Sequence, residues 1–198
     1  MCMQKMKSLF KKDFEDHKVI IHNEVTEGCE WVLNGEGIPT QKLDGTCCLI
    51  KDGKIYARFD YKPGRTLPEG AIPCQEEADP VTGHFPHWVL VEDQSQYKYH
   101  KKAFERMVSE SGVPEDGTYE LIGKHFMSNP EKVEGDCDIL VKHGSVVLED
   151  CERTFEGIRD FLSNHYIEGI VYHRGNGEMC KIKRSDFGME WNGKTTKH

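Results

Sequence analysis

Short runs of alternating apolar and polar residues follow one another along most of this chain, and glycine-containing turns join several of them. Residues 47–58 contain two such runs around Asp52-Gly53, a pair that suits the positive backbone angles of a two-residue turn. Residues 167–183 contain two more around Gly175-Asn176-Gly177. The pattern therefore predicts two β-hairpins, which favour antiparallel sheets over a doubly wound parallel sheet.

Longer patterns predict the helices and the remaining strands. Apolar residues recur at helical spacing in residues 97–111, and Thr154 is placed to cap a second helix. Further strands are expected at residues 19–21 and 117–123, and a strand pair at 138–141 with 145–148. Residues 66–96 are rich in proline and glycine, so we expect a long loop or a small insertion there.

Length and composition predict one soluble globular domain. The 198 residues are enough for a single domain, residues 1–198, with a real core, and 37% of them are hydrophobic and 30% charged. No apolar run approaches the roughly 20 residues that a membrane-spanning helix needs. The N-terminus lacks the apolar core and cleavage site of a secretory signal. We therefore expect an intracellular, cytoplasmic protein with no membrane partner.

Eight cysteines and ten histidines raise the question of a disulfide framework or a metal site. The cysteines form no Cys-x-x-Cys pair, and a reducing compartment is the simpler interpretation without a signal peptide. No His-Glu-x-x-His motif occurs. The sequence therefore predicts free thiols and no structural zinc.

The formal net charge of −8 disfavours nucleic acid as a partner of the whole surface. Positive charge is concentrated in two stretches, Lys98–Lys102 and the segment that contains Lys181, Lys183, Arg184, Lys194 and Lys197. A local basic groove is one interpretation of these clusters. A solvated charged face is the other, and it suits the first stretch at least as well.

Lys42 is the candidate nucleophile. It stands two residues before Asp44-Gly45, and its amine can attack phosphorus only where burial or nearby positive charge favours the neutral form. Lys181 and Lys183 alternate along a predicted strand, so both point to one face and can supply that charge. Alternating lysines on an edge strand also serve simply to discourage aggregation.

Two glutamates interrupt apolar runs, Glu120 in Tyr119–Gly123 and Glu168 in Glu168–Tyr172. A carboxylate in such a run is costly to bury alone, so Glu120 should be bound to a donor or a metal ion, and a structural carboxylate in a salt bridge is the alternative. Glu168 is the better candidate for a divalent cation such as Mg²⁺, which prefers oxygen ligands.

The ordered set Lys-x-Asp-Gly, aromatic-Glu-Leu-x-Gly, Glu-Gly-Ile-Val and Lys-x-Lys resembles motifs I, III, IV and V of the covalent nucleotidyltransferase superfamily. Those motifs begin here at Lys42, Tyr119, Glu168 and Lys181. Together with their flanks, between Ile38 and Trp191, they are similar to the vertebrate ATP-dependent RNA ligases, which join 5′-phosphate to 3′-hydroxyl RNA ends. Four residues alone would be a weak signal, whereas the ordered set is a specific one.

The resemblance implies a role for each matching residue. Lys42 would be the catalytic nucleophile that forms lysyl-AMP with ATP, and the divalent metal ion, Mg²⁺ or Mn²⁺, would be bound by Glu168 and Glu120. Nucleotide contacts would come from Lys42 and from Gln41, Arg58, Glu120, Lys181 and Lys183. The partners would be ATP and RNA, and the protein would act as a monomer.

The resemblance also implies an α+β fold: an antiparallel-sheet adenylation domain of the ATP-grasp-like DNA/RNA ligase type, with a nucleotide cleft between sheets. Because 15 residues follow Lys183, we expect no C-terminal OB domain. Either the adenylation domain is then sufficient, or end joining needs a partner protein. His143 is the nearest substitute for the aromatic residue that stacks on adenine, although a histidine in a turn is the more ordinary interpretation. A DNA ligase, a capping guanylyltransferase and an inactive nucleic-acid-binding module are the alternatives.

Overall fold

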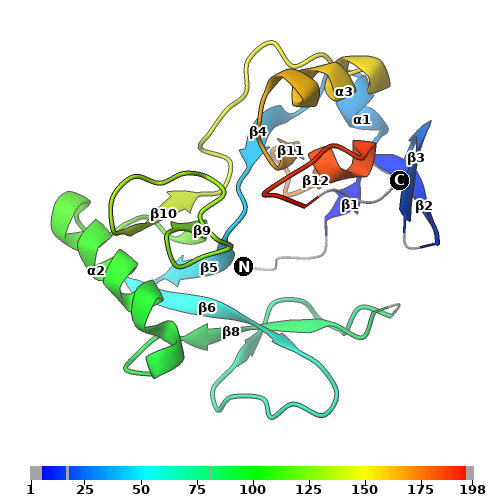
Figure 1. Ribbon diagram of the computed structural model, residues 1–198. Helices are drawn as coiled ribbons and strands as arrows, with labels where there is room; N and C mark the ends of the chain where they lie inside the picture. Colours follow the sequence, from blue (N-terminus) through cyan, green and yellow to red (C-terminus); the bar gives the residue numbers. More distant parts are fainter. Residues whose placement is uncertain (1–5, 17, 81, 195–198) are drawn as a thin grey trace. The chain divides into compact units, whose positions relative to one another are not determined.

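The computed structural model describes residues 6–16, 18–80 and 82–194, and the chain divides into two compact units. We call Asp44–His143 the central unit and Met6–Leu43 with residues 144–194 the terminal unit, after their places in the sequence. Both contain mainly antiparallel strands together with helices (Figure 1), which confirms the predicted α+β class. That residues 1–198 form one nucleotidyltransferase domain stays a prediction.

Six strands form the sheet of the central unit, in the order β10-β9-β5-β6-β8-β7. Their bounds are Thr46–Lys51 (β5), Lys54–Tyr61 (β6), Ile72–Pro73 (β7), Phe85–Leu90 (β8), Gly117–Gly123 (β9) and Asp138–Lys142 (β10). The short η1 helix (Ser95–Tyr97) leads into α2 (Lys98–Ser111), the first predicted helix. Ala103 of α2 packs with Ile50 and Leu121 in a buried cluster, so this helix covers one face of the sheet.

The turn between β5 and β6 has the backbone that its sequence predicts. Asp52 and Gly53 have φ angles of 51° and 69°, the positive values of a two-residue hairpin turn that matches the twist of its strands. Cys48 then lies opposite Ala57, which confirms the first predicted hairpin. One position further, the alternation of the two strands brings Arg58 beside Cys47.

The terminal unit has a four-stranded sheet and a separate two-stranded sheet. The order of the first is β1-β12-β11-β4, with bounds Lys7–Ser8, Met179–Lys183, Gly169–His173 and Ile38–Lys42. β1 is parallel to β12, and the other pairs are antiparallel, including the second predicted hairpin, β11 and β12. The remaining elements are β2 (Phe10–Glu15), β3 (Lys18–Val25), α1 (Glu30–Leu33), α3 (Phe155–Asn164) and η2 (Arg184–Phe187).

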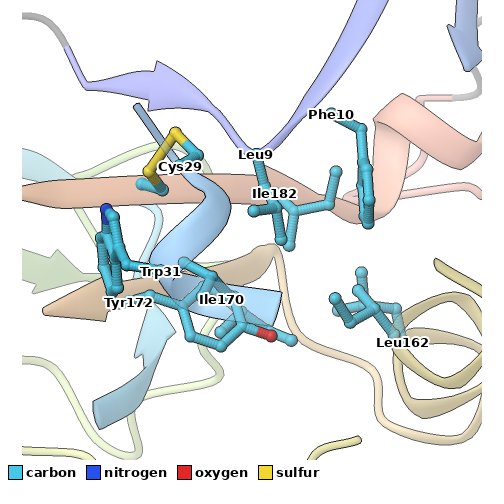
Figure 2. Packing of buried hydrophobic residues seen from close by; sticks show 11 residues of the cluster. Leu9, Phe10, Cys29, Trp31, Leu162, Ile170, Tyr172 and Ile182 are labelled. Carbon is cyan, nitrogen blue, oxygen red and sulfur yellow. A yellow bond between two sulfur atoms is a disulfide. The ribbon is translucent and has the colours of Figure 1, made fainter. Parts of the chain in front are cut away.

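A single buried cluster joins these elements. Figure 2 shows side chains from β11, β12, α1, α3 and the residue after β1 packed together, among them Leu9, Trp31, Leu162, Ile170, Tyr172 and Ile182. Thr154 accepts a hydrogen bond from the amide of Gly157 at 3.0 Å, which confirms the predicted cap of α3. Within the described part of the chain, no helix is long and apolar enough to cross a membrane.

The prediction that all cysteines are free thiols is wrong for one pair. Cys29, before α1, forms a disulfide with Cys180 of β12, 151 positions away in the sequence, whereas five other described cysteines are free. Both sulfurs lie in the buried cluster of Figure 2, where packing of α1 against the sheet brings the two Cα atoms to 6.2 Å. Because tertiary packing makes this pair, the spacing of the cysteines gives no sign of it.

Two further predictions are wrong, the loop at residues 66–96 and the strand pairing of residues 145–148. Residues 66–96 are not one long loop, because β8 lies within them and pairs with both β6 and β7. Four consecutive residues of β8 are buried, so the strand has no alternating pattern to reveal it. Residues 145–148 do not pair with β10. They run beside β4 instead, with a single bridge between Val147 and Thr40.

Candidate active site

Three neighbouring strands of the terminal unit carry the predicted lysines. Gly169, the first residue of β11, lies opposite Lys42 of β4 on one side and opposite Lys183 of β12 on the other. Directly opposite residues share a face of the sheet, and Lys181 shares it too because it lies two positions before Lys183. The prediction that the second hairpin brings the two lysines together in one sheet beside Glu168 is confirmed.

Glu168 directly precedes β11 and contacts the proposed nucleophile. Lys42 Nζ donates a hydrogen bond to Glu168 Oε2 at 2.5 Å, and the two side chains are 21% and 13% exposed. This contact orients the amine. An amine that carries a third proton has no lone pair for attack. The amine therefore has to lose a proton and part from Glu168 before it reacts.

Lys181 lies close to three other lysine side chains, Lys42, Lys183 and Lys12. Its pKa is lowered to about 8, first by burial and then by the charges of Lys42, Lys183 and Lys12, against the opposite effect of Glu168. Lys12 comes from β2 and donates a hydrogen bond to Asp186 at 2.8 Å. The face that carries Lys42 is thus strongly electropositive, as binding of a phosphate requires.

We expect Lys181→Met to stabilise the protein at neutral pH. Because the folded pKa of Lys181, about 8, lies below the ordinary value of 10.5, the unfolded state binds more protons between these two pH values. The cost of the buried charge is therefore fully present below pH 8 and fades as the pH rises toward 10.5. Thermal unfolding of both proteins across this range should show an advantage for the variant that is largest at pH 7 and then shrinks.

Lys102→Met is the control for this prediction, because Lys102 lies exposed on α2. It should give no stabilisation that depends on pH. An advantage of Lys181→Met that stays constant across the range would show that better apolar packing, and not the removal of a charge, is its cause.

Glu120 of β9 is bound by two donors in the central unit. Its Oε1 accepts a hydrogen bond from the amide of Gly45 at 3.0 Å, and its Oε2 lies 2.8 Å from Nε2 of His143. The prediction that Glu120 needs a partner is confirmed, because its carboxylate accepts hydrogen bonds from two donors. Gly45 is required here because a Cβ atom would lie 2.1 Å from the carbonyl oxygen of Leu121, so the Asp-Gly pair permits the close approach to β9.

Cys47 and Arg58 continue the same row of side chains across the central sheet. Cys47 lies opposite Glu120, and burial, followed by the charge of Glu120, raises the pKa of its thiol, while Arg58 acts in the opposite direction. Arg58 Nε donates a hydrogen bond to Asp60 at 3.0 Å. Its guanidinium therefore lies near Cys47, on the face that carries Glu120.

The structure distributes the predicted residues over the two units. The terminal unit contains Gln41, Lys42, Glu168, Lys181 and Lys183, whereas the central unit contains Arg58 and Glu120. Gln41 lies opposite Ile170, a core residue, so the alternation of β4 directs its side chain away from the face of Lys42. Its contact with a nucleotide stays a prediction, as do the roles of the other residues.

The basic stretch Lys98–Lys102 fits the solvated-face interpretation. His100 is buried, and burial lowers its pKa to about 4, so it adds no charge at neutral pH. Lys101 is bound to Asp93 at 2.6 Å. Of the second stretch, Lys197 lies outside the described residues.

Sequence reasoning missed Lys12 and Cys47 as neighbours of the site residues. Nothing near Lys12 in the sequence indicates its place, because the contact depends on how the β2–β3 hairpin packs. The position of Cys47 could have been predicted from the sequence. If the strand that follows Lys42-x-Asp-Gly is paired with the strand that carries Glu120, Cys47 lies opposite Glu120. His143, considered for stacking, binds Glu120 instead.

Comparison with known proteins gives matches over both units. The family model described as RNA ligase 1 matches residues 106–197. A protein named RNA ligase 1 from Pongo abelii is 27% identical, over 78% of this chain and 68% of the relative. Its namesakes from Rattus norvegicus and Danio rerio are 26% and 24% identical, over 91% and 77% of this chain and 76% and 67% of their own lengths. This chain is therefore related, over most of its length, to the vertebrate RNA ligase 1 family, as its motifs predicted.

Proposed function

We propose that this chain is an ATP-dependent RNA ligase that joins 5′-phosphate and 3′-hydroxyl RNA ends, a reaction of RNA repair. The observation that carries the proposal is the position of Lys42, bound to Glu168 at 2.5 Å and on the same sheet face as Lys181 and Lys183. The name RNA ligase 1, borne by its relatives, favours RNA over DNA as the substrate.

In the first step the neutral amine of Lys42 attacks the α-phosphorus of ATP. A nitrogen–phosphorus bond forms, the bond to the bridging oxygen breaks, and pyrophosphate leaves with that electron pair while the amine releases a proton to solvent. Negative charge moves onto the phosphate oxygens during this transfer. Lys181 and Lys183 are placed on the face of Lys42 to neutralise it.

The next two steps move AMP to the RNA and then release it. An oxygen of the RNA 5′-phosphate attacks the α-phosphorus of lysyl-AMP, and RNA-adenylate forms. The nitrogen–phosphorus bond breaks, its electron pair stays on the Lys42 nitrogen, and the amine takes up a proton from solvent. The 3′-hydroxyl of the other end then attacks the 5′-phosphorus. It loses its proton, AMP leaves, and a phosphodiester bond joins the two ends.

Glu168 of the terminal unit is the residue proposed to bind the metal ion, and Glu120 of the central unit is the other candidate for this role. Both are carboxylates, 13% exposed, and Mg²⁺ and Mn²⁺ prefer such oxygen ligands together with water. When bound, the ion would neutralise charge on the phosphates of ATP. Glu120 would also accept the ribose hydroxyls, and Arg58 and Gln41 would contact the nucleotide. A monomeric protein with a nucleotidyltransferase fold of the DNA/RNA ligase type completes the proposal.

The test is covalent labelling of the wild-type protein. We would incubate it with Mg²⁺ and α-labelled ATP, or separately GTP, and analyse it by denaturing electrophoresis. Label from ATP alone is expected, and nicked or single-stranded substrates with RNA or DNA ends would then be compared for joining.

Each other outcome supports one of the alternatives. Label from GTP only would indicate capping chemistry, and label from ATP with faster joining of DNA ends would indicate a DNA ligase. A folded protein that takes no label from either nucleotide would be a binding module, and the proposal would fall.

A further inference from the structure

Three metal-ligating side chains meet on one face of the central sheet. Cys47 of β5 lies directly opposite Glu120 of β9, and Glu120 lies opposite Val141 of β10. His143 lies two positions after Val141 and therefore on the same face, and its amide continues the pairing with a hydrogen bond to Thr118 at 3.0 Å. Three adjacent strands thus direct a thiol, a carboxylate and an imidazole to one place.

The donor atoms of the three side chains lie close enough to one another to approach one metal ion. One donor atom from each of the three side chains lies within 4.8 Å of the others. A tetrahedral zinc ion, about 2.0–2.3 Å from each ligand, places its ligand atoms about 3.3–3.8 Å apart, so side-chain movements of about 1 Å would close the site. The strands that carry these residues belong to one sheet within one compact unit, so their relative positions are part of the fold.

The imidazole has an unused nitrogen. His143 Nε2 contacts Glu120 at 2.8 Å, whereas Nδ1 is buried and has no hydrogen-bond partner among the described residues. A buried polar atom without a partner is costly and calls for an explanation. Rotation of the His143 ring about its χ angles would present either nitrogen to an ion. His143 and Glu120 would then both coordinate the ion and no longer contact each other directly.

The ligand types select the class of ion. Thiolate and imidazole favour Zn²⁺ and similar borderline ions such as Co²⁺, whereas Mg²⁺ takes oxygen ligands almost only. Titratable groups beside Glu120 that interact with Cys47 include Arg58, Asp60, Cys74 and Cys48, and Arg58 is paired with Asp60. Binding would release one proton from the thiol to solvent, because the thiolate is the form that binds a metal ion.

We propose that Cys47, Glu120 and His143 form a site for a thiophilic divalent cation of the Zn²⁺ class, with a fourth position open to water. Glu120 is also a candidate ligand for the Mg²⁺ or Mn²⁺ of the proposed reaction, so the two kinds of ion would compete for this carboxylate, and the thiol and imidazole would select the thiophilic ion. The site for the thiophilic ion does not depend on that reaction, because the ion binds to the protein alone.

Cobalt is the probe that tests this site without nucleotide. Metal-free full-length protein in anaerobic buffer is titrated with Co²⁺, and the absorption of the thiolate–cobalt bond is followed in the near ultraviolet. One equivalent should produce the band, and Zn²⁺ but not excess Mg²⁺ should remove it. Cys47→Ser should abolish the band and weaken binding by at least about 100-fold, because even loss of an outer-shell partner typically costs about 10–100-fold.

Two further variants keep the test decisive. His143→Gln retains a donor for Glu120 and should also weaken Co²⁺ binding, whereas Cys137→Ser removes another free thiol of the central unit and should change nothing. Circular dichroism verifies that each variant is folded. A band that persists in Cys47→Ser, or an unchanged affinity in folded His143→Gln, would overturn the proposal.

Discussion

Lys42→Arg should abolish covalent labelling by ATP while leaving the fold intact. Arginine keeps the positive charge and can still bind Glu168, but its guanidinium remains protonated at any physiological pH and offers no lone pair. The substitution therefore separates the structural contact from the chemistry. Labelling should fall below detection in denaturing electrophoresis, and the unfolding midpoint should shift little, because a partly exposed ion pair contributes only about 1 kcal/mol or less.

Lys12→Arg is a closely matched control for this prediction. Lys12 is also 21% exposed and also bound to a carboxylate of the terminal unit, Asp186, at 2.8 Å. It should retain labelling. If Lys42→Arg still took the label, the nucleophile would be another residue, and peptide mapping of the labelled protein would identify it.

The parts of this fold that could be predicted are those encoded by neighbouring residues. Asp52-Gly53 predicts its hairpin because few other residue pairs adopt two positive φ angles, and Thr154 predicts the start of α3 because its side chain satisfies an amide three residues later. β8 was not predicted, because it is buried on both faces and its residues therefore do not alternate between apolar and polar.

The candidate site was predictable where motif residues share a sheet. Lys42, Lys181 and Lys183 meet because one short strand, β11, pairs with both of the strands that carry them. The Cys29–Cys180 disulfide and the approach of Lys12 could not be predicted, because both arise from packing between elements far apart in the sequence. Predictions from local pattern therefore fail where tertiary packing alone makes the contact.

The glycine of Glu168-Gly169 should be as important to the reaction as the charged residues around it. A Cβ atom at Gly169 would lie 2.2 Å from the carbonyl oxygen of Ile182 and 2.9 Å from Cα of Lys183. These are backbone atoms of β12, so no side chain can turn aside to relieve the clash. Gly169→Ala should therefore separate β11 from β12, at a cost of about 1–3 kcal/mol or more in the free energy of unfolding.

Separation of these strands would displace both lysines that flank Gly169. Lys42 and Lys183 lie opposite this residue, and a displacement of about 1 Å in a reacting group can cost about 100-fold in rate. We expect Gly169→Ala to label with ATP at least about 100-fold more slowly than wild type, measured at a temperature where both proteins are folded.

Gly175→Ala separates this effect from a general loss of stability. Gly175 lies in the turn of the same hairpin at φ +90°, with no atom within 4 Å of an added Cβ, so alanine there costs about 1–2 kcal/mol of backbone strain and no clash. It should lower the unfolding midpoint and leave the labelling rate of the folded protein near that of wild type. Equal labelling rates for both alanine variants would mean that the spacing of β11 and β12 does not position Lys42, and the role given to this sheet would have to be withdrawn.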